Sequence, residues 1–131
     1  MFIDASAVVA LLAGEPGSDE LKRALKTSER RHASALVVYE AVLALIRILG
    51  KSRNEVLKIV QDFLDINAVK IVAIDLEISE LALEAFERFG KGGHPASLNM
   101  GDCFSYACAK KLKQPLLFKG DDFSKTDILK A

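Results

Sequence analysis

Met1-Phe2-Ile3-Asp4-Ala5-Ser6 is the stretch that decides the fold. Its first three residues are apolar and stop at a carboxylate, as a short buried strand of a parallel sheet does. Residues 6–13, which follow at once, are apolar on nearly every side and predict a buried helix that Gly14 and Pro16 end. A strand that passes directly into a helix indicates an α/β architecture.

The remainder of the chain keeps this alternation. Further strands are predicted at residues 31–33, 69–74 and 115–118. Further helices are predicted at residues 18–28, from the cap Ser34 to Gly50, from Ser52 onward, at residues 76–89, and from Asn99 or Asp102 through Leu112. We therefore expect an α/β domain with a central parallel β-sheet flanked by α-helices, and no linker or repeat.

The composition fits one small aliphatic domain. The chain has 131 residues, of which 50% are hydrophobic and 7% aromatic, and this length suits a single domain with its own core. No apolar run approaches the roughly 20 residues of a membrane span. No basic leader precedes the first apolar stretch, so a signal peptide is not expected. Cys103 and Cys108 are too few and too close for a disulfide framework and fit reduced thiols in a cytoplasmic protein.

The formal net charge is zero. This balance argues against a protein that coats duplex DNA through bulk charge, although a local basic patch can still steer a nucleic acid. Lys110, Lys111 and Lys113 form one basic cluster, and Arg88 with Lys91 forms another. Both are as expected for ordinary solvated helix ends.

Acidic side chains lie at the edges of four apolar segments: Asp4, Glu40, Asp102 and the pair Asp121–Asp122. A carboxylate beside buried surface is costly unless a cation or a hydrogen-bond donor compensates it. Because the carboxyl ends of parallel strands meet at one crevice, Asp4 and the pair should lie there together. Asp102 falls at a helix start, where free N–H groups stabilise a carboxylate. Glu40 lies inside an apolar helix, where only a cation or a polar partner would compensate it.

Oxygen ligands in this number predict a site for hard divalent cations and metal-dependent phosphodiester chemistry. Asp4 and Asp102 would bind the metal directly. Glu40 would bind a second ion or position the attacking water. Asp122 or Asp121 would complete the ring of ligands.

Most of these acids also have a simpler structural explanation when each is taken alone. Asp4 fits a strand-end cap, Asp102 a helix cap, and Asp121–Asp122 a solvated turn. Glu40 fits no such role, because its flanks are apolar. Ser6 adds a hydroxyl that would hydrogen-bond a ligand or a metal-bound water. We therefore interpret the acids jointly, as one site.

Four motifs resemble, in order and spacing, those of PIN-domain ribonucleases, and specifically the VapC toxin family of bacterial toxin–antitoxin pairs. They are the opening strand with Asp4 and Ser6 (residues 1–7), the segment 34–40 with Glu40, the segment 98–104 with Asp102, and the final strand and acidic turn of residues 115–123. One departure is Gly120, which stands where many relatives place the fourth acid. Asp122, directly before Phe123, has a counterpart in many relatives, so the resemblance favours it over Asp121.

This resemblance implies a single PIN domain over residues 1–131, with a central parallel sheet of about four or five strands. It implies a Mg²⁺- or Mn²⁺-dependent endoribonuclease toxin that cuts structured RNA, often tRNA or rRNA, and arrests translation. The metal-binding and catalytic residues would be Asp4, Glu40, Asp102 and Asp122, with Ser6 and Asp121 supporting them. The implied partners are a second copy in a homodimer and a VapB-type antitoxin that inserts a basic side chain into the acidic pocket.

Three alternatives share some of these features. A signalling receiver domain also has an acidic Mg²⁺ pocket, and Asp75 and Lys119 would serve as its other residues. It expects paired acids after the first strand, however, where Asp4 stands alone. A haloacid-dehalogenase-type phosphatase likewise needs a second Asp two residues after Asp4. A catalytically inactive PIN-like module that binds RNA or protein is the third alternative, and the intact acids disfavour it.

Overall fold

The computed structural model describes all 131 residues. Four strands form one parallel sheet in the order β3-β2-β1-β4, with bounds β1 Phe2–Ile3, β2 Arg31–Ser34, β3 Val69–Val72 and β4 Leu116–Leu117. The helices are α1 Ala5–Ala13, α2 Ser18–Thr27, α3 Ala35–Leu49, α4 Arg53–Ile66, α5 Leu76–Phe89, α6 Met100–Leu112 and the 3₁₀ helix η1 Phe123–Lys125. The predicted α/β fold with a parallel sheet flanked by helices is confirmed.

Two strands are shorter than the sequence predicts, because their partners end early. In the β1–β4 pair, Phe2 lies opposite Leu116 and Ile3 opposite Leu117, after which β1 gives way to α1. Residues 115–118 therefore contribute only two residues to the sheet. β3 ends at Val72, since its last partner, Ser34, caps the next helix.

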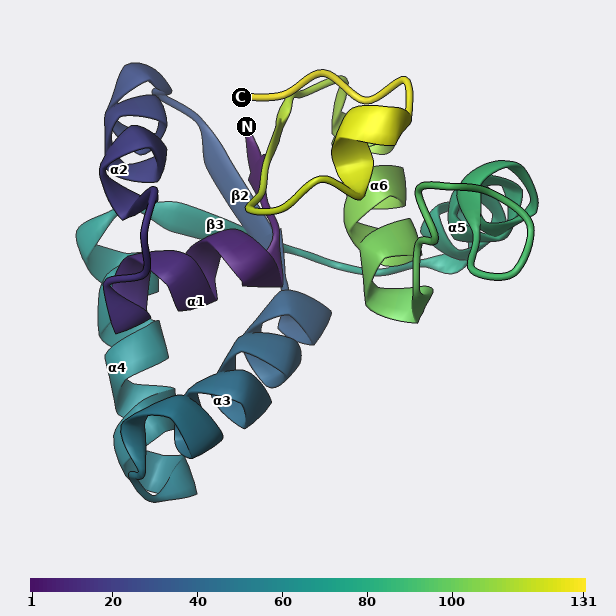
Figure 1. Ribbon diagram of the computed structural model, residues 1–131. Helices are drawn as coiled ribbons and strands as arrows, with labels where there is room; N and C mark the ends of the chain where they lie inside the picture. Colours follow the sequence, from purple (N-terminus) through teal and green to yellow (C-terminus); the bar gives the residue numbers. More distant parts are fainter.

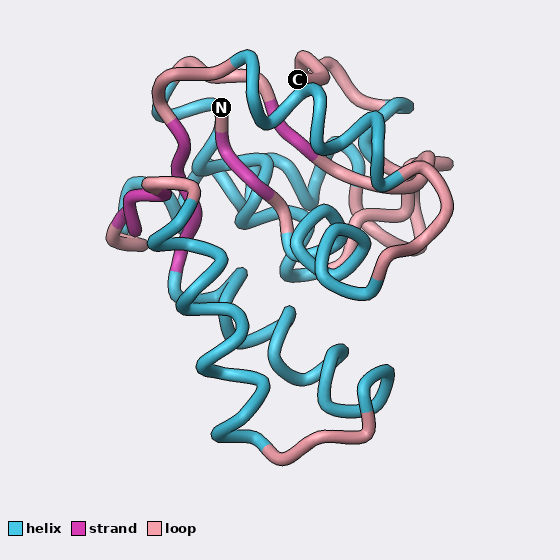
Figure 2. Tube along the Cα trace, turned by 90° about the vertical axis from the view of Figure 1, so that its left-hand side faces the viewer, coloured by secondary structure: helices cyan, strands magenta, loops and turns pink.

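The helices form layers on the two sides of this narrow sheet (Figure 1). α1, α2 and α4 lie on one side of it, and α5 and α6 lie together on the other. α3 and α4 form a hairpin that extends away from the strands, which Figure 2 shows from the side. The N- and C-terminal ends of the chain lie near each other at the opposite end of the molecule from this hairpin.

The centre of the sheet is also the centre of the hydrophobic core. Phe2, Ile3, Leu116 and Leu117 are completely buried. The backbone N–H of Asp4 continues the ladder by donating to the carbonyl of Leu117 at 2.9 Å. The first acid of the sequence is thus fixed at the carboxyl edge of the two central strands, which is where the active or binding sites of parallel sheets form.

None of the helices combines the length and the hydrophobicity that crossing a membrane requires.

Candidate active site: an acidic cluster at the carboxyl edge of the sheet

Asp4 lies at the base of the cluster and is only 4% exposed. It ends β1 with an extended backbone and caps α1, because its Oδ2 accepts from the backbone N–H of Ser6 at 2.9 Å. The hydroxyl of Ser6 donates to the same Oδ2 at 2.5 Å. The predicted support of Asp4 by Ser6 is therefore present, and both bonds use one carboxylate oxygen, which leaves Oδ1 for another partner.

Glu40 reaches the cluster from α3. This helix begins where β2 ends, and Ser34 caps it by accepting from the N–H of Val37 at 3.2 Å. The Oε1 atom of Glu40 is buried and has no hydrogen-bond partner. Burial, and then the charges of Asp4 and Asp102, raise the pKa of Glu40 to about 7. A buried carboxylate oxygen without a donor is unusual and indicates that a proton or a cation belongs beside it.

Gly101 makes this position of Glu40 possible. A β-carbon built on Gly101 would overlap both the carboxylate oxygens and Cδ of Glu40. α6 therefore contacts α3 through a residue with no side chain, and the Glu40 carboxylate fills the space that a side chain would take. Glycine in the first turn of a helix lowers helix stability, so close approach to Glu40 is the physical reason for it here.

Asp102 lies in the first turn of α6, in a capping box with Asn99. Its backbone N–H donates to Oδ1 of Asn99 at 2.9 Å, and its own Oδ2 accepts from the N–H of Asn99 at 3.0 Å. Burial raises the pKa of Asp102 to about 6, the bond from Asn99 opposes this rise, and the charges of Asp4 and Asp122 add to it. Burial among acids thus outweighs the stabilisation that a helix start offers a carboxylate.

The acidic turn after β4 contributes Asp122 to the same field of charge. Asp122 is exposed and directly precedes η1, and its charge reaches Asp102. Asp121 is exposed as well, and its carbonyl accepts from the hydroxyl of Ser124 at 2.5 Å. The structure therefore gathers Asp4, Glu40, Asp102 and Asp122 within electrostatic reach of one another.

The acids do not converge far enough to form a closed ligand group. No three His, Cys, Asp or Glu side chains stand in an arrangement that could hold a metal ion directly. The donor chemistry nevertheless fits a hard cation: carboxylate oxygens, one of them buried without a partner. Mg²⁺ commonly keeps several waters and uses only one or two carboxylates, so water-bridged binding, or small side-chain rotations, would complete such a site.

Three residues near the site were not singled out by sequence reasoning for the roles that they have. One is Gly101, whose only signal in the sequence was that a glycine stood at the start of a predicted helix. The others are Glu15 and Lys119, which form an ion pair beside a pocket of about 450 Å³ that Ser6 and Glu40 also line. No local signal reveals that pair, because its members are 104 residues apart in the sequence.

The fold and the position of the acids define a PIN-like domain, and the PIN domain family model matches residues 1–129. The chain is 40% identical to ribonuclease VapC42 of Mycobacterium tuberculosis over 132 residues, covering all of this chain and 98% of that protein. It is 40% identical to ribonuclease VapC of Mycolicibacterium smegmatis over 128 residues, covering 98% of this chain and 97% of that protein. The chain therefore belongs to the PIN-domain family and, within it, to the VapC ribonucleases.

A solved structure agrees with this assignment at the level of the fold. The crystal structure of VapC20 of Mycobacterium tuberculosis, a toxin that cleaves the sarcin–ricin loop, superposes with a TM-score of 0.78 at 19% identity, covering 99% of this chain and 97% of that one. Family membership removes the receiver and phosphatase alternatives. Asp75, the residue on which the receiver reading depended, instead caps α5 and pairs with Lys111 at 2.7 Å.

Proposed function

We propose that this protein is a metal-dependent endoribonuclease toxin that hydrolyses RNA phosphodiester bonds and is held inactive by a VapB-type antitoxin. Its membership of the VapC ribonucleases supports the activity. The observation that carries the choice of site is the buried, unpartnered Oε1 of Glu40 facing the charges of Asp4 and Asp102. tRNA and rRNA are the substrates that the resemblance favours, and an enzyme that acts on them would work in the cytoplasm.

The free carboxylate oxygens support the choice of Asp4, Glu40, Asp102 and Asp122 as the residues that would hold Mg²⁺ or Mn²⁺. The hydrogen bonds to Asp4 and to Asp102 both go to Oδ2, so the Oδ1 atom of each is left for a cation. Oε1 of Glu40 is the third such oxygen, and the exposed carboxylate of Asp122 is the fourth acid that we assign to the site. A bound divalent cation would neutralise the phosphate and lower the pKa of an attacking water.

Three side chains of the protein, those of Ser6, Glu40 and Asn99, would orient the groups that react. The Ser6 hydroxyl fixes Asp4 in one orientation, so that no rotamer freedom is lost when substrate binds. Without a metal the pKa of Glu40 is about 7, so a cation that binds at its Oε1 would displace a proton near neutral pH and leave a carboxylate that orients the attacking water. Asn99 orients Asp102 through the capping box.

An acidic pocket of this kind also suits a basic inhibitor. Arginine binds carboxylates through paired, charge-assisted hydrogen bonds, and the oxygens named above would accept them as readily as they would bind a metal. We therefore expect a VapB-type antitoxin to present a basic side chain to this cluster. Metal and antitoxin should then compete for Asp4, Glu40 and Asp102.

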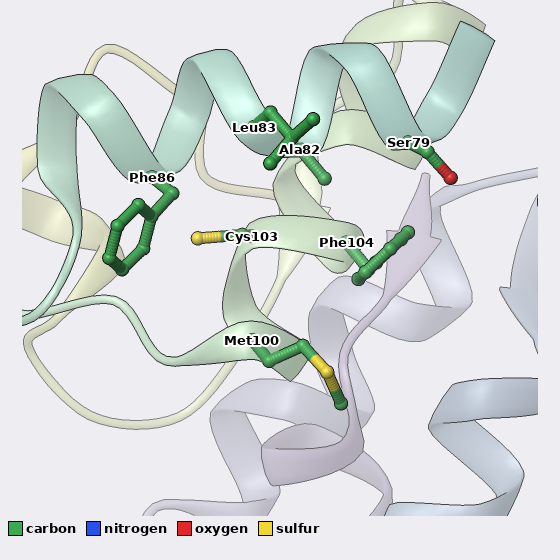
Figure 3. Close-up of a pocket in the computed structure, with 7 residues that line it drawn as sticks. All are labelled: Ser79, Ala82, Leu83, Phe86, Met100, Cys103 and Phe104. Atoms are coloured by element: carbon green, nitrogen blue, oxygen red, sulfur yellow. The ribbon is translucent and has the colours of Figure 1, made fainter. Parts of the chain in front are cut away.

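A second copy of the chain is the expected partner at the face that α5 and α6 form. α5 and α6 form an apolar pocket of about 320 Å³ (Figure 3). Around it Leu83, Phe86 and Met100 are 65%, 52% and 67% exposed. Met100 directly precedes Gly101 and Asp102, so a homodimer through this face would bring two acidic sites toward one shared RNA surface. Light scattering should find a dimer that Leu83→Asp converts to a monomer.

The experiment that tests the activity compares RNA cleavage by the purified protein in Mg²⁺, in Mn²⁺ and in EDTA, with Asp4→Asn as the inactive variant. We expect metal-dependent cleavage that Asp4→Asn lowers by orders of magnitude, because a central oxygen ligand is lost. Asp19→Asn, on the exposed face of α2, is the matched control and should cleave like wild type.

Two results would contradict the proposal in different ways. Equal cleavage by wild type and Asp4→Asn would mean that a contaminant cuts the RNA. A folded, antitoxin-free protein that binds Mn²⁺ and cuts neither tRNA nor rRNA would favour the inactive binding module.

A further inference from the structure

Lys119 is anchored directly beside the acidic cluster. It follows β4 closely, and its backbone N–H donates to the Ser6 hydroxyl at 3.1 Å. The same hydroxyl donates to Oδ2 of Asp4 at 2.5 Å. Through this one serine the backbone of Lys119 has a fixed position relative to Asp4, so any movement of its charge must come from its side chain.

The ammonium of Lys119 forms an ion pair with Glu15, which lies just after α1. Their ion pair stands at the pocket of about 450 Å³ that Ser6 and Glu40 also line. Lys119 is the one basic residue of that lining. The lining of this pocket therefore contains both Glu40 of the acidic cluster and the Lys119–Glu15 ion pair.

An RNA strand that reaches the acidic cluster beside this pocket meets mainly negative charge. Its phosphates would approach Asp4, Glu40, Asp102 and Asp122, and a bound metal offsets only part of that repulsion. A positive group beside the metal would lower the remaining barrier to binding. Among the basic clusters of the sequence, Arg88 and Lys110 bind Asp127, and Lys111 binds Asp75 and Glu77. Lys91 and Lys113 form no ion pair, and none of these five residues lines the pocket.

Lys119 is free to change partners. Its side chain is 35% exposed and that of Glu15 is 33% exposed, and an ion pair this open to solvent contributes little to stability. A phosphate can replace Glu15 as an equally charged acceptor, with several oxygens for the ammonium to bind. The flexible four-carbon stem of lysine allows the exchange without movement of the backbone.

We propose that Lys119 is a substrate-positioning residue. When RNA binds, its ammonium separates from Glu15 and binds a phosphate of the RNA backbone next to the scissile bond. In the free enzyme Glu15 forms an ion pair with this lysine, and Glu15 itself does not contact the RNA. This assignment rests on the proposed ribonuclease function. It adds to that function a specific contact with the sugar–phosphate chain, independent of base identity.

The test uses a matched pair of variants that break the same ion pair from opposite ends. Lys119→Met keeps the aliphatic stem and loses the charge, whereas Glu15→Gln frees the lysine. In steady-state cleavage of a labelled RNA with Mn²⁺, we expect Lys119→Met to raise KM about tenfold with kcat within about threefold of wild type. Glu15→Gln should lower KM or leave it unchanged, and Lys119→Arg should recover most of the loss.

The salt dependence of RNA affinity gives a second measurement. Loss of an ion pair that has only a structural role would leave this salt dependence unchanged. Loss of one phosphate contact should reduce the slope of log affinity against log salt concentration by about 0.7 for single-stranded RNA. Lys119→Met should show this reduction, and Glu15→Gln should not. If both variants lose stability and activity in parallel, the pair only braces the fold and the inference is overturned.

The outcomes separate this inference from the proposed activity. A wild-type enzyme that cleaves RNA, beside a Lys119→Met variant with unchanged KM and salt slope, would overturn the role of Lys119 and leave the ribonuclease intact. If the wild type cleaves no RNA, the ribonuclease proposal fails. Equilibrium binding of a labelled RNA by wild type and Lys119→Met then decides the lysine contact, and equal affinities would reject it.

Discussion

Gly101 lies so close to Glu40 that a β-carbon on the glycine would occupy the space of the Glu40 carboxylate. The contact joins the first turn of α6 to the middle of α3. It therefore sets the position of Glu40 relative to Asp102, the next residue along α6. Gly101 is thus part of the acidic site, because its lack of a side chain leaves room for the Glu40 carboxylate.

Gly101→Ala tests this relationship. Alanine favours helix over glycine by up to about 1 kcal/mol, and the atoms that it strikes are the end of a flexible side chain, which can move. We expect the melting temperature to change little while RNA cleavage falls at least tenfold, because Glu40 is displaced from Asp4 and Asp102. Thermal unfolding and cleavage rates measured on the same preparation would show the separation.

Gly93→Ala is the control, because a β-carbon there meets nothing within 4 Å and the backbone φ is not positive. It should leave cleavage unchanged. Wild-type cleavage by Gly101→Ala would mean that the position of the Glu40 carboxylate does not matter for the reaction.

Glu40 should also make stability depend on pH when no metal is present. Its pKa is raised from 4.5 to about 7 by burial and by the charges of Asp4 and Asp102. Between these values the folded state keeps a proton that the unfolded state releases, so the free energy of unfolding falls as pH rises from about 4.5 through about 7. Asp102, raised to about 6, adds a decline of the same sign at lower pH.

Glu40→Gln removes the titrating group and nearly keeps its shape. In EDTA at pH 8 we expect this variant to be more stable than wild type by about 1 kcal/mol, a value reduced for the partial exposure of Glu40. At pH 5 the difference should shrink, since Glu40 is then protonated in the fold. Urea unfolding at both pH values measures this, with Glu80→Gln on the exposed face of α5 as control. A stability difference that does not depend on pH would contradict the raised pKa.

The local pattern of the sequence was enough to predict most of this fold. Cap residues and glycines mark the helix ends: Ser34 and Ser52 cap α3 and α4, and Gly50 ends α3. The acids were predictable because each stands at the edge of an apolar segment, and parallel strands bring their carboxyl ends together. That reasoning predicted Asp4 at the carboxyl edge of the sheet, where its backbone N–H donates to the carbonyl of Leu117.

The contacts between distant segments were not predictable in the same way. The periodicity of one helix reports which face is buried, but it does not report what lies against that face. Gly101 against Glu40, and Glu15 against Lys119, join elements whose relative placement only the folded chain defines. The raised pKa of Asp102 could not be predicted for the same reason, because its causes are burial in the fold and the charges of Asp4 and Asp122.

The two neighbouring acids of the final turn should differ in metal binding. Asp121 and Asp122 are both exposed, but it is the charge of Asp122 that reaches Asp102. A cation that binds only the folded state increases the free energy of unfolding by mass action, by about 2.7 kcal/mol when its concentration is a hundred times Kd. The melting temperature rises accordingly. We expect Mn²⁺ to stabilise wild type and Asp121→Asn alike, Asp122→Asn clearly less, and Asp4→Asn hardly at all.

Thermal scans over a Mn²⁺ titration distinguish these cases without any activity assay. Reversed behaviour, with Asp121→Asn impaired and Asp122→Asn normal, would assign the fourth acid to Asp121. Equal stabilisation of all the variants would place the metal outside this cluster.

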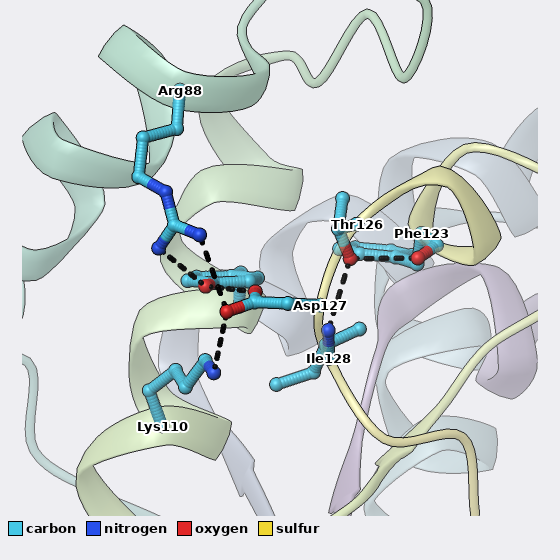
Figure 4. Close-up of polar contacts among 7 residues, drawn as sticks. Arg88, Lys110, Phe123, Thr126, Asp127 and Ile128 are labelled. Atoms are coloured by element: carbon cyan, nitrogen blue, oxygen red, sulfur yellow. Dashed lines mark hydrogen bonds and ion pairs between the residues drawn. The ribbon is translucent and has the colours of Figure 1, made fainter.

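Asp127 fastens the C-terminal segment to the α5–α6 pair (Figure 4). Its carboxylate accepts from the Tyr106 hydroxyl at 2.5 Å, from Lys110 at 3.1 Å and from Arg88 at 3.2 Å. Burial alone would raise its pKa, but the bonds from Tyr106, Lys110 and Arg88 outweigh burial and lower the pKa to about 2. The stabilisation is therefore present above its ordinary value near 3.8 and is lost as pH falls through about 2.

Asp127→Asn should lower the free energy of unfolding by about 1 kcal/mol at pH 7, a value that allows for solvent screening of a side chain that is 46% exposed. The penalty should fade near pH 2, where wild type is protonated as well. Asp62→Asn breaks an exposed i,i+4 pair with Lys58 on α4 and should change stability by less than about 0.5 kcal/mol. Urea unfolding at pH 7 and at low pH measures both variants. An Asp127→Asn penalty that is the same at both pH values would show that packing, and not the charged hydrogen bonds, holds this segment in place.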